Sequence, residues 1–135
     1  MVRLVVGLII VLHGLVHLLY FGQSARLFEL APGMTWPDGS WVFSTILGDN
    51  TTRWLANITC ILVAICFITG SVGIYLSQPW WRTALVASAV FSGVVFILFW
   101  NGRLQQLDKQ GGVGILIDAM ILVSVLVLKW PKVDF

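Results

Sequence analysis

The chain has 135 residues, of which 59% are hydrophobic and only 10% are charged, and its formal net charge at pH 7 is +2. A typical soluble domain has about 25% charged residues, so this composition excludes a soluble globular domain. No basic run or basic helix face of the kind that binds nucleic acid is present. We therefore expect a single domain whose surroundings are membrane lipid.

Four apolar stretches are each close to the length of one membrane crossing, which takes about 20 helical residues. They cover residues 4–21, 54–76, 83–100 and 113–128. Aromatic residues such as Tyr20, Trp54 and Trp100 stand at their edges, as is typical of rings at the headgroup level. The sequence predicts one all-α transmembrane domain over residues 1–135, folded as an antiparallel four-helix bundle.

The first connection, residues 22–53, is much longer than the other two. Its residues 24–30 favour a short interfacial helix, and residues 41–47 are apolar enough to lie on the membrane. Turn signals stand between them at residues 32–33 and 37–39. We expect this long loop to cap one end of the bundle.

The distribution of Lys and Arg predicts the orientation of the chain. The two sides of the predicted bundle carry equal numbers of these residues, and the N-terminal amine tips the balance towards its own side. Because the more positive side faces the cytoplasm, we expect both termini in the cytoplasm and the long loop outside.

Small residues recur at helical spacing inside the predicted spans. Such residues let two helices approach closely in lipid, so we expect them at helix contacts. The residues are Gly14, Gly70, Gly73, Ala84, Ser88 and Ser92.

Three predicted spans contain polar groups that lipid disfavours: His13 and His17 in the first, Asn57 in the second and Asp118 in the fourth. Counted at about 1.5 Å per residue from the loop-side ends of the spans, His17, Asn57 and Asp118 lie within roughly 5–8 Å of the same membrane face. We expect them to share a pocket, with His13 about one turn deeper. An unpaired ionised Asp in a span costs about 2.5–3.5 kcal/mol, so Asp118 needs a partner, for which His17 is the first candidate.

The pattern leaves three interpretations of these residues open. His13, His17, Asn57 and Asp118 could bind a ligand such as a quinone headgroup or handle protons, a task that suits histidine near neutral pH. Alternatively, a His–Asp hydrogen bond could only fix the helix register. A metal site of His13, His17 and Asp118, or haem held by one histidine, is the third interpretation.

The first span also resembles the start of DoxX-like membrane proteins. Arg3, Gly7, Gly14 and His17 follow the spacing Arg-x3-Gly-x6-Gly-x2-Lys, except that His17 stands where that family commonly has lysine. The order of a first helix, an outer loop and three further helices is similar as well. The resemblance implies a small prokaryotic inner-membrane protein, often an accessory subunit near quinone-linked or thiol redox enzymes.

Three functions therefore remain open from the sequence. The first is an accessory or binding subunit with a polar intramembrane pocket on the long-loop side, which holds a quinone and contacts a membrane protein partner or a second copy of the chain. The second is a redox enzyme that uses a quinone, a metal or haem. The third is a purely structural subunit of a larger membrane assembly. No nucleophile elbow, phosphate-binding loop or dinucleotide fingerprint is present to decide whether the chain is an enzyme.

Overall fold

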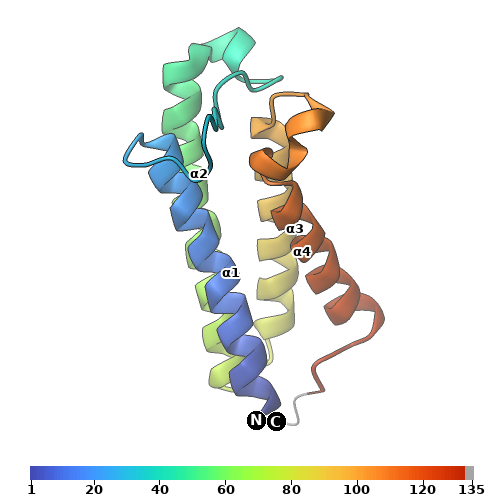
Figure 1. The fold of residues 1–135 in the computed structure, drawn as a ribbon. Coiled ribbons are helices and arrows are strands. Elements are labelled where there is room, and N and C mark those ends of the chain that lie inside the picture. The colour runs from blue at the N-terminus through green and yellow to red at the C-terminus, as the bar shows by residue number, and fades with distance from the viewer. Residues whose placement is uncertain (133–135) are drawn as a thin grey trace.

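The computed structural model describes residues 1–132, and within this range the chain forms helices and turns without strands. Three long helices come first: α1 (Val2–Ser24), α2 (Ser44–Tyr75) and α3 (Trp81–Phe99). The 3-10 helix η1 (Leu104–Gln110), helix α4 (Gly112–Leu122) and the π-helical turn η2 (Val123–Val127) follow. Successive long helices run in opposite directions, and α4 descends beside α3 (Figure 1).

Three of these elements are long and apolar enough to cross a membrane: α1, α3 and the segment Phe43–Tyr75. The predicted fourth span, 113–128, is one short helical stretch, Gly112–Val127, in which α4 continues into η2. This stretch reaches the length of a span only when it is joined to η1, and the two are bent by 71°. The fold of the described residues is therefore all-helical as predicted, with three helices of spanning length and a fourth segment broken at Gly111. Of the three, α2 is kinked near its start, at Gly48.

Gly111 explains the bend before α4. Its φ of +91° is left-handed, a conformation that glycine adopts without strain. A Cβ at this position would also collide with the Phe96 ring. The chain can therefore turn sharply here while η1 stays outside the bundle and α4 begins against α3.

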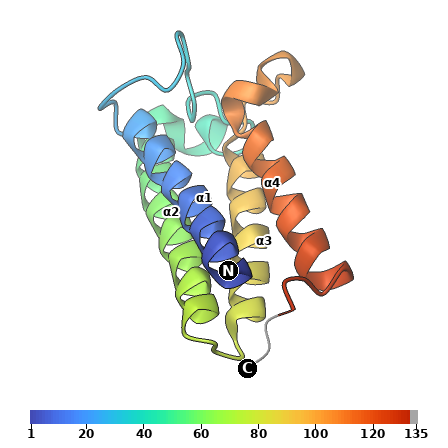
Figure 2. The same ribbon diagram turned by 60° about the horizontal axis from the view of Figure 1, so that its bottom comes forward.

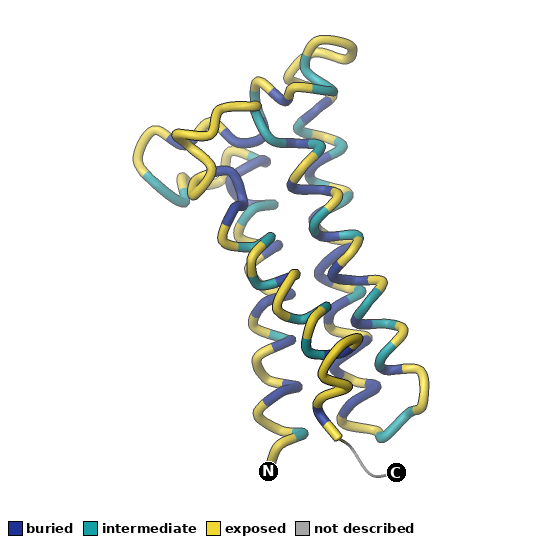
Figure 3. Tube along the Cα trace, turned by 90° about the vertical axis from the view of Figure 1, so that its right-hand side faces the viewer, coloured by how far each residue is buried: buried dark blue, intermediate teal, exposed yellow. Residues whose placement is uncertain are grey.

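The helices pack in sequence order: α1 on α2, α2 on α3, and α3 on α4. The first and last of these helices, α1 and α4, lie on the open side of the arrangement (Figure 2). The buried core between the helices is built around large side chains that include Phe67, Trp81, Leu85 and Phe96. Exposed residues follow the outer sides of the helices along most of their length (Figure 3).

The loop between α1 and α2 is shorter than predicted, because α1 continues to Ser24 and α2 already begins at Ser44. Residues 25–43 contain turns but no helix, so the predicted interfacial helix at 24–30 is wrong. The buried Gln23 side chain explains this. Its Nε2 donates to the Met34 carbonyl at 3.0 Å, and its Oε1 accepts from the Leu30 backbone N–H at 3.0 Å. These bonds hold the loop folded back over the end of α1.

Substitution of Gly14 by alanine, which adds one methyl group, tests how closely α1 and α2 approach each other. A Cβ on Gly14 would lie 2.9 Å from the Phe67 Cβ, whereas a Cβ on Gly93 would meet nothing within 4 Å. We expect Gly14→Ala to leave the protein about 1–3 kcal/mol less stable than Gly93→Ala, which gains helix propensity without a clash. Denaturant unfolding in detergent measures both, and equal stabilities would contradict this packing.

Candidate functional site

A buried hydrogen bond connects the first helix to the last. The Nε2 atom of His13 on α1 lies 2.9 Å from the Oδ1 atom of Asp118 on α4. The two residues are only 5% and 2% exposed. A carboxylate in such surroundings requires a partner, and His13 provides it.

His17 makes its own hydrogen bonds, one turn along α1. Its Nδ1 lies 3.1 Å from the backbone carbonyl of His13, and its Nε2 lies 2.8 Å from the Ser92 hydroxyl on α3. Because a carbonyl can only accept, Nδ1 carries a hydrogen. In the neutral ring Nε2 then accepts from the hydroxyl of Ser92, so both nitrogens of His17 are satisfied.

Two phenylalanines enclose the histidine rings. Phe67 of α2 meets the His13 ring edge-on at a centroid distance of 4.8 Å and lies 5.7 Å from the His17 ring. Phe96 of α3 lies 5.3 Å from His17 on another side. These rings exclude water, and electrostatic interactions between the polar groups are stronger as a result.

The His13–Asp118 pair has unused hydrogen-bonding capacity. The Nδ1 of His13 and the Oδ2 of Asp118 are both buried without a hydrogen-bond partner among the described residues. Buried polar atoms normally have such a partner. One nitrogen and one oxygen are therefore left at this site to donate to or accept from a further molecule.

The predicted pairing of His17 with Asp118 is wrong. Gly111 and Gly114 both lie against Phe96, so α4 begins about one turn below the end of α3 rather than level with it. Asp118 consequently reaches the depth of His13, one turn below His17. His17 is also rotated by about 40° from His13 around α1, and it faces α3.

Asn57 does not join this cluster, so the prediction of a shared pocket is wrong for this residue. It lines a separate hollow at the end of α1, about two turns above His17, which we call the interfacial hollow. The residues that line this hollow are Ser24, Ala25, Arg26, Asn50, Arg53, Trp54 and Asn57. The count from the sequence assumed that the second span begins at Trp54. Because Trp54 already lies well inside α2, this count places Asn57 too low relative to His17.

The predicted small residues lie at several different contacts. Gly14 approaches Phe67, Gly70 approaches Leu85, and Gly73 approaches Trp80 and Trp81. Ser92 bonds to His17, and the hydroxyl of Ser88 donates to the Ala84 carbonyl within α3. Both serines are buried inside the chain, so they do not form an exposed face for another protein.

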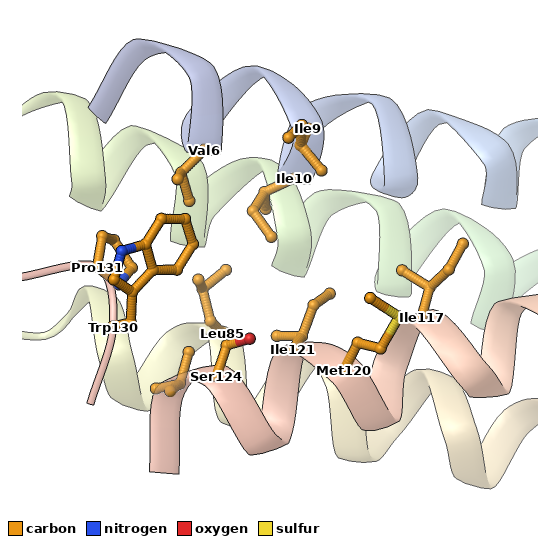
Figure 4. Close-up of a pocket in the computed structure, with 11 residues that line it drawn as sticks. Val6, Ile9, Ile10, Leu85, Ile117, Met120, Ile121, Ser124, Trp130 and Pro131 are labelled. Atoms are coloured by element: carbon orange, nitrogen blue, oxygen red, sulfur yellow. The ribbon is translucent and has the colours of Figure 1, made fainter. Parts of the chain in front are cut away.

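An apolar groove lies between α1 and α4, and its lining includes helix neighbours of His13 and Asp118 but neither of these two residues. Its volume is about 350 Å³. Ile10 stands one turn before His13, and Ile117 and Ile121 flank Asp118 along α4. Trp130 and Pro131 close the far end (Figure 4). The full lining of this α1–α4 groove is Val6, Ile9, Ile10, Leu85, Ile117, Met120, Ile121, Ser124, Val125, Trp130 and Pro131.

The donor groups do not suit a metal ion. No group of three His, Cys, Asp or Glu side chains within residues 1–132 could hold one. His17 has both ring nitrogens engaged by Ser92 and by the His13 carbonyl. The alternative metal site of His13, His17 and Asp118 is therefore not formed, and haem ligation by His17 would require breaking one of these hydrogen bonds.

Two features of the site are missing from the sequence prediction. Ser92 stands out there only as a small packing residue, and no periodicity identifies it as the partner of His17. The α1–α4 groove requires knowledge of which helices are neighbours. Comparisons with protein-family models, with curated proteins and with solved structures found no match for this chain.

Mutational coupling tests which histidine holds Asp118. Removing one partner of a buried pair leaves the other uncompensated, so His13→Leu and Asp118→Leu should each cost about 3–5 kcal/mol of unfolding free energy. The double variant should recover much of this loss. A double-mutant cycle in detergent measures the coupling, and the same cycle for His17 and Asp118 is the control. Stronger coupling of Asp118 to His17 than to His13 would refute the observed pairing.

Proposed function

We propose that this chain is a small integral membrane protein, folded as a four-helix bundle whose fourth crossing is the broken segment after Gly111. The support is the surface of the helices. Large apolar side chains are exposed along α1, among them Leu8, Leu12 and Leu19. Hydrocarbon is the solvent that suits such a surface.

We further propose that both termini lie in the cytoplasm, at the inner membrane of a prokaryote. The start of α1 and the last described residues lie at the same end of the molecule, since Val6 and Pro131 line the same groove. The choice of that end as the cytoplasmic one rests on the distribution of basic residues, and the kind of membrane rests on the resemblance to DoxX-like proteins.

Within the membrane, the proposed function is that of a binding subunit for a quinone. The observation that carries this proposal is an apolar groove lined by the helix neighbours of His13 and Asp118, beside a pair that has two unpaired polar atoms. Ligand sites in proteins are typically apolar hollows of this size with a few polar groups that fix the orientation. An isoprenoid tail suits the groove, and a carbonyl-bearing headgroup suits the pair.

The hydrogen-bonding groups of the His13–Asp118 pair suit both the oxidised quinone and the reduced quinol. A quinone carbonyl can accept a hydrogen bond from the Nδ1 of His13 when that nitrogen is protonated, and a quinol hydroxyl can donate to the Oδ2 of Asp118. A shared proton between Nε2 and Oδ1 keeps the pair neutral overall, which is the favourable state in the membrane interior. The proposed role is binding and proton exchange, with electron transfer assigned to a partner protein.

Access to the pair requires α1 and α4 to separate. Both side chains are covered in the structure, but the extensive helix contacts join α1 to α2, α2 to α3 and α3 to α4. The boundary between α1 and α4 is the open side of the bundle. A headgroup can enter there from the lipid and meet the unpartnered Nδ1 of His13 and Oδ2 of Asp118.

Binding of a benzoquinone that carries a single isoprene unit tests this proposal. Quenching of tryptophan fluorescence reports binding, because Trp130 lines the groove. We expect saturable quenching by the unmodified protein and a dissociation constant about tenfold higher or more for the double variant His13→Leu and Asp118→Leu, in which the hydrogen bonds of the pair are lost.

Leu126→Ala provides the control, because Leu126 is 57% exposed and lies outside the groove. Its dissociation constant should equal that of the unmodified protein. If the double variant binds the quinone equally well, the pair serves only to hold α1 against α4, and the binding function is wrong. Absence of saturable quenching in the unmodified protein would contradict it as well.

A further inference from the structure

The interfacial hollow is a second site, separate from the His13–Asp118 pair. It lies where α1 ends and the apolar part of α2 begins, and its volume is about 510 Å³. Two arginines, Arg26 and Arg53, contribute to its walls, and no acidic residue does. The hollow therefore offers positive charge at the level where a helix leaves the hydrocarbon.

Two carboxylates lie near these two arginines, since Asp38 pairs with both and Asp49 interacts electrostatically with both. Arg26 donates to the Oδ2 of Asp38, and Arg53 donates to its Oδ1 at 3.2 Å. Arg53 also donates to the side-chain oxygen of Asn50. Two carboxylates therefore stand against two guanidinium groups, so an anion would be held here by the remaining N–H donors and not by an excess of positive charge. Each guanidinium has five N–H donors, so both arginines retain donors for an anion.

Asn57 adds a second requirement for the ligand. Its Oδ1 is buried in the wall of the hollow without a hydrogen-bond partner among the described residues. Such an oxygen needs a donor, which a bare phosphate diester cannot supply. A ligand that fills both needs carries a negative charge and, close to it, a hydroxyl or ammonium group.

The surface below the hollow is apolar. Trp54, Asn57, Ile58, Ile61 and Ile65 follow the i, i+3, i+4, i+7, i+11 spacing of one helix face, and the four apolar members of this stripe are 36% exposed or more. The large exposed ring of Trp54 stands at the rim, as in membrane-interface belts. A ligand in the hollow can therefore extend hydrocarbon chains along α2.

We propose that the interfacial hollow binds the headgroup of an anionic phospholipid. The arginines hold the phosphate, in the manner of basic pockets between membrane helices. The Oδ1 of Asn57 accepts a hydrogen bond from a headgroup hydroxyl, and the acyl chains lie along the apolar stripe of α2. This site is independent of the quinone proposed for the α1–α4 groove.

Native mass spectrometry of the detergent-solubilised protein tests the proposal with two lipids of equal chain length. Phosphatidylglycerol has the hydroxyl donors that the site needs, whereas phosphatidylcholine has none. We expect phosphatidylglycerol to bind more tightly. Arg53→Gln should weaken its binding about fivefold, the effect of roughly one basic residue at a membrane surface.

Asn57→Leu is the second variant, because it leaves the arginine pairs with Asp38 intact. It should weaken the binding of phosphatidylglycerol about fivefold, the effect of one lost hydrogen bond. The affinity for phosphatidylcholine should not change. Arg103→Gln is the control, since Arg103 does not line this hollow. It should change the affinity for neither lipid.

Equal affinities for the two lipids, or equal losses in Asn57→Leu and Arg103→Gln, would overturn the proposal. Inorganic phosphate is added in a final arm of the experiment. If it displaces phosphatidylglycerol from the unmodified protein, the hollow binds a soluble anion rather than a lipid, and the proposal is wrong. Retention of the lipid in the presence of phosphate supports it.

Discussion

The hydrogen bond between His13 and Asp118 is the interaction on which the rest of this structure depends. It joins the first helix to the last in surroundings where neither side chain reaches water. Alone, the carboxylate would be a buried charge without a partner, and the imidazole would leave a polar edge against Phe67. Paired, the two groups set the depth of α4 relative to α1. The sharp turn at Gly111 allows α4 to start at that depth. His17 bonds to Ser92 instead, so it does not compete for Asp118.

The same bond explains how an open side can exist in so small a bundle. The other helix boundaries are closed by large side chains such as Phe67, Trp81 and Phe96, whereas α1 and α4 enclose a groove lined almost entirely by hydrocarbon. In the proposed membrane setting, apolar side chains gain little by meeting one another. A polar contact is therefore the efficient way to hold two helices together, and the groove beside it stays available for an apolar chain.

The sequence predicts the helical fold well and the site only in part. Length and apolarity locate α1, α2 and α3, and the polar residues His13, His17 and Asp118 stand out because lipid disfavours them. Which of them pair depends on the level at which α4 starts, and counting residues cannot reveal this level because the chain bends at Gly111. The prediction that Asn57 shares this pocket is wrong for a related reason, because helix α2 begins well before its apolar part. Ser92 has no sequence signal that separates it from other small residues at helix contacts.

In this structure His13, and not His17, holds Asp118, while His17 keeps a hydrogen on Nδ1. Solid-state NMR of the protein in lipid bilayers, with nitrogen-15 in the imidazole rings, tests this pairing most directly. Asp118→Asn should shift the Nε2 resonance of His13 and leave the spectrum of His17 that of an Nδ1–H ring. A shift of the His17 nitrogens together with an unchanged His13 would contradict it.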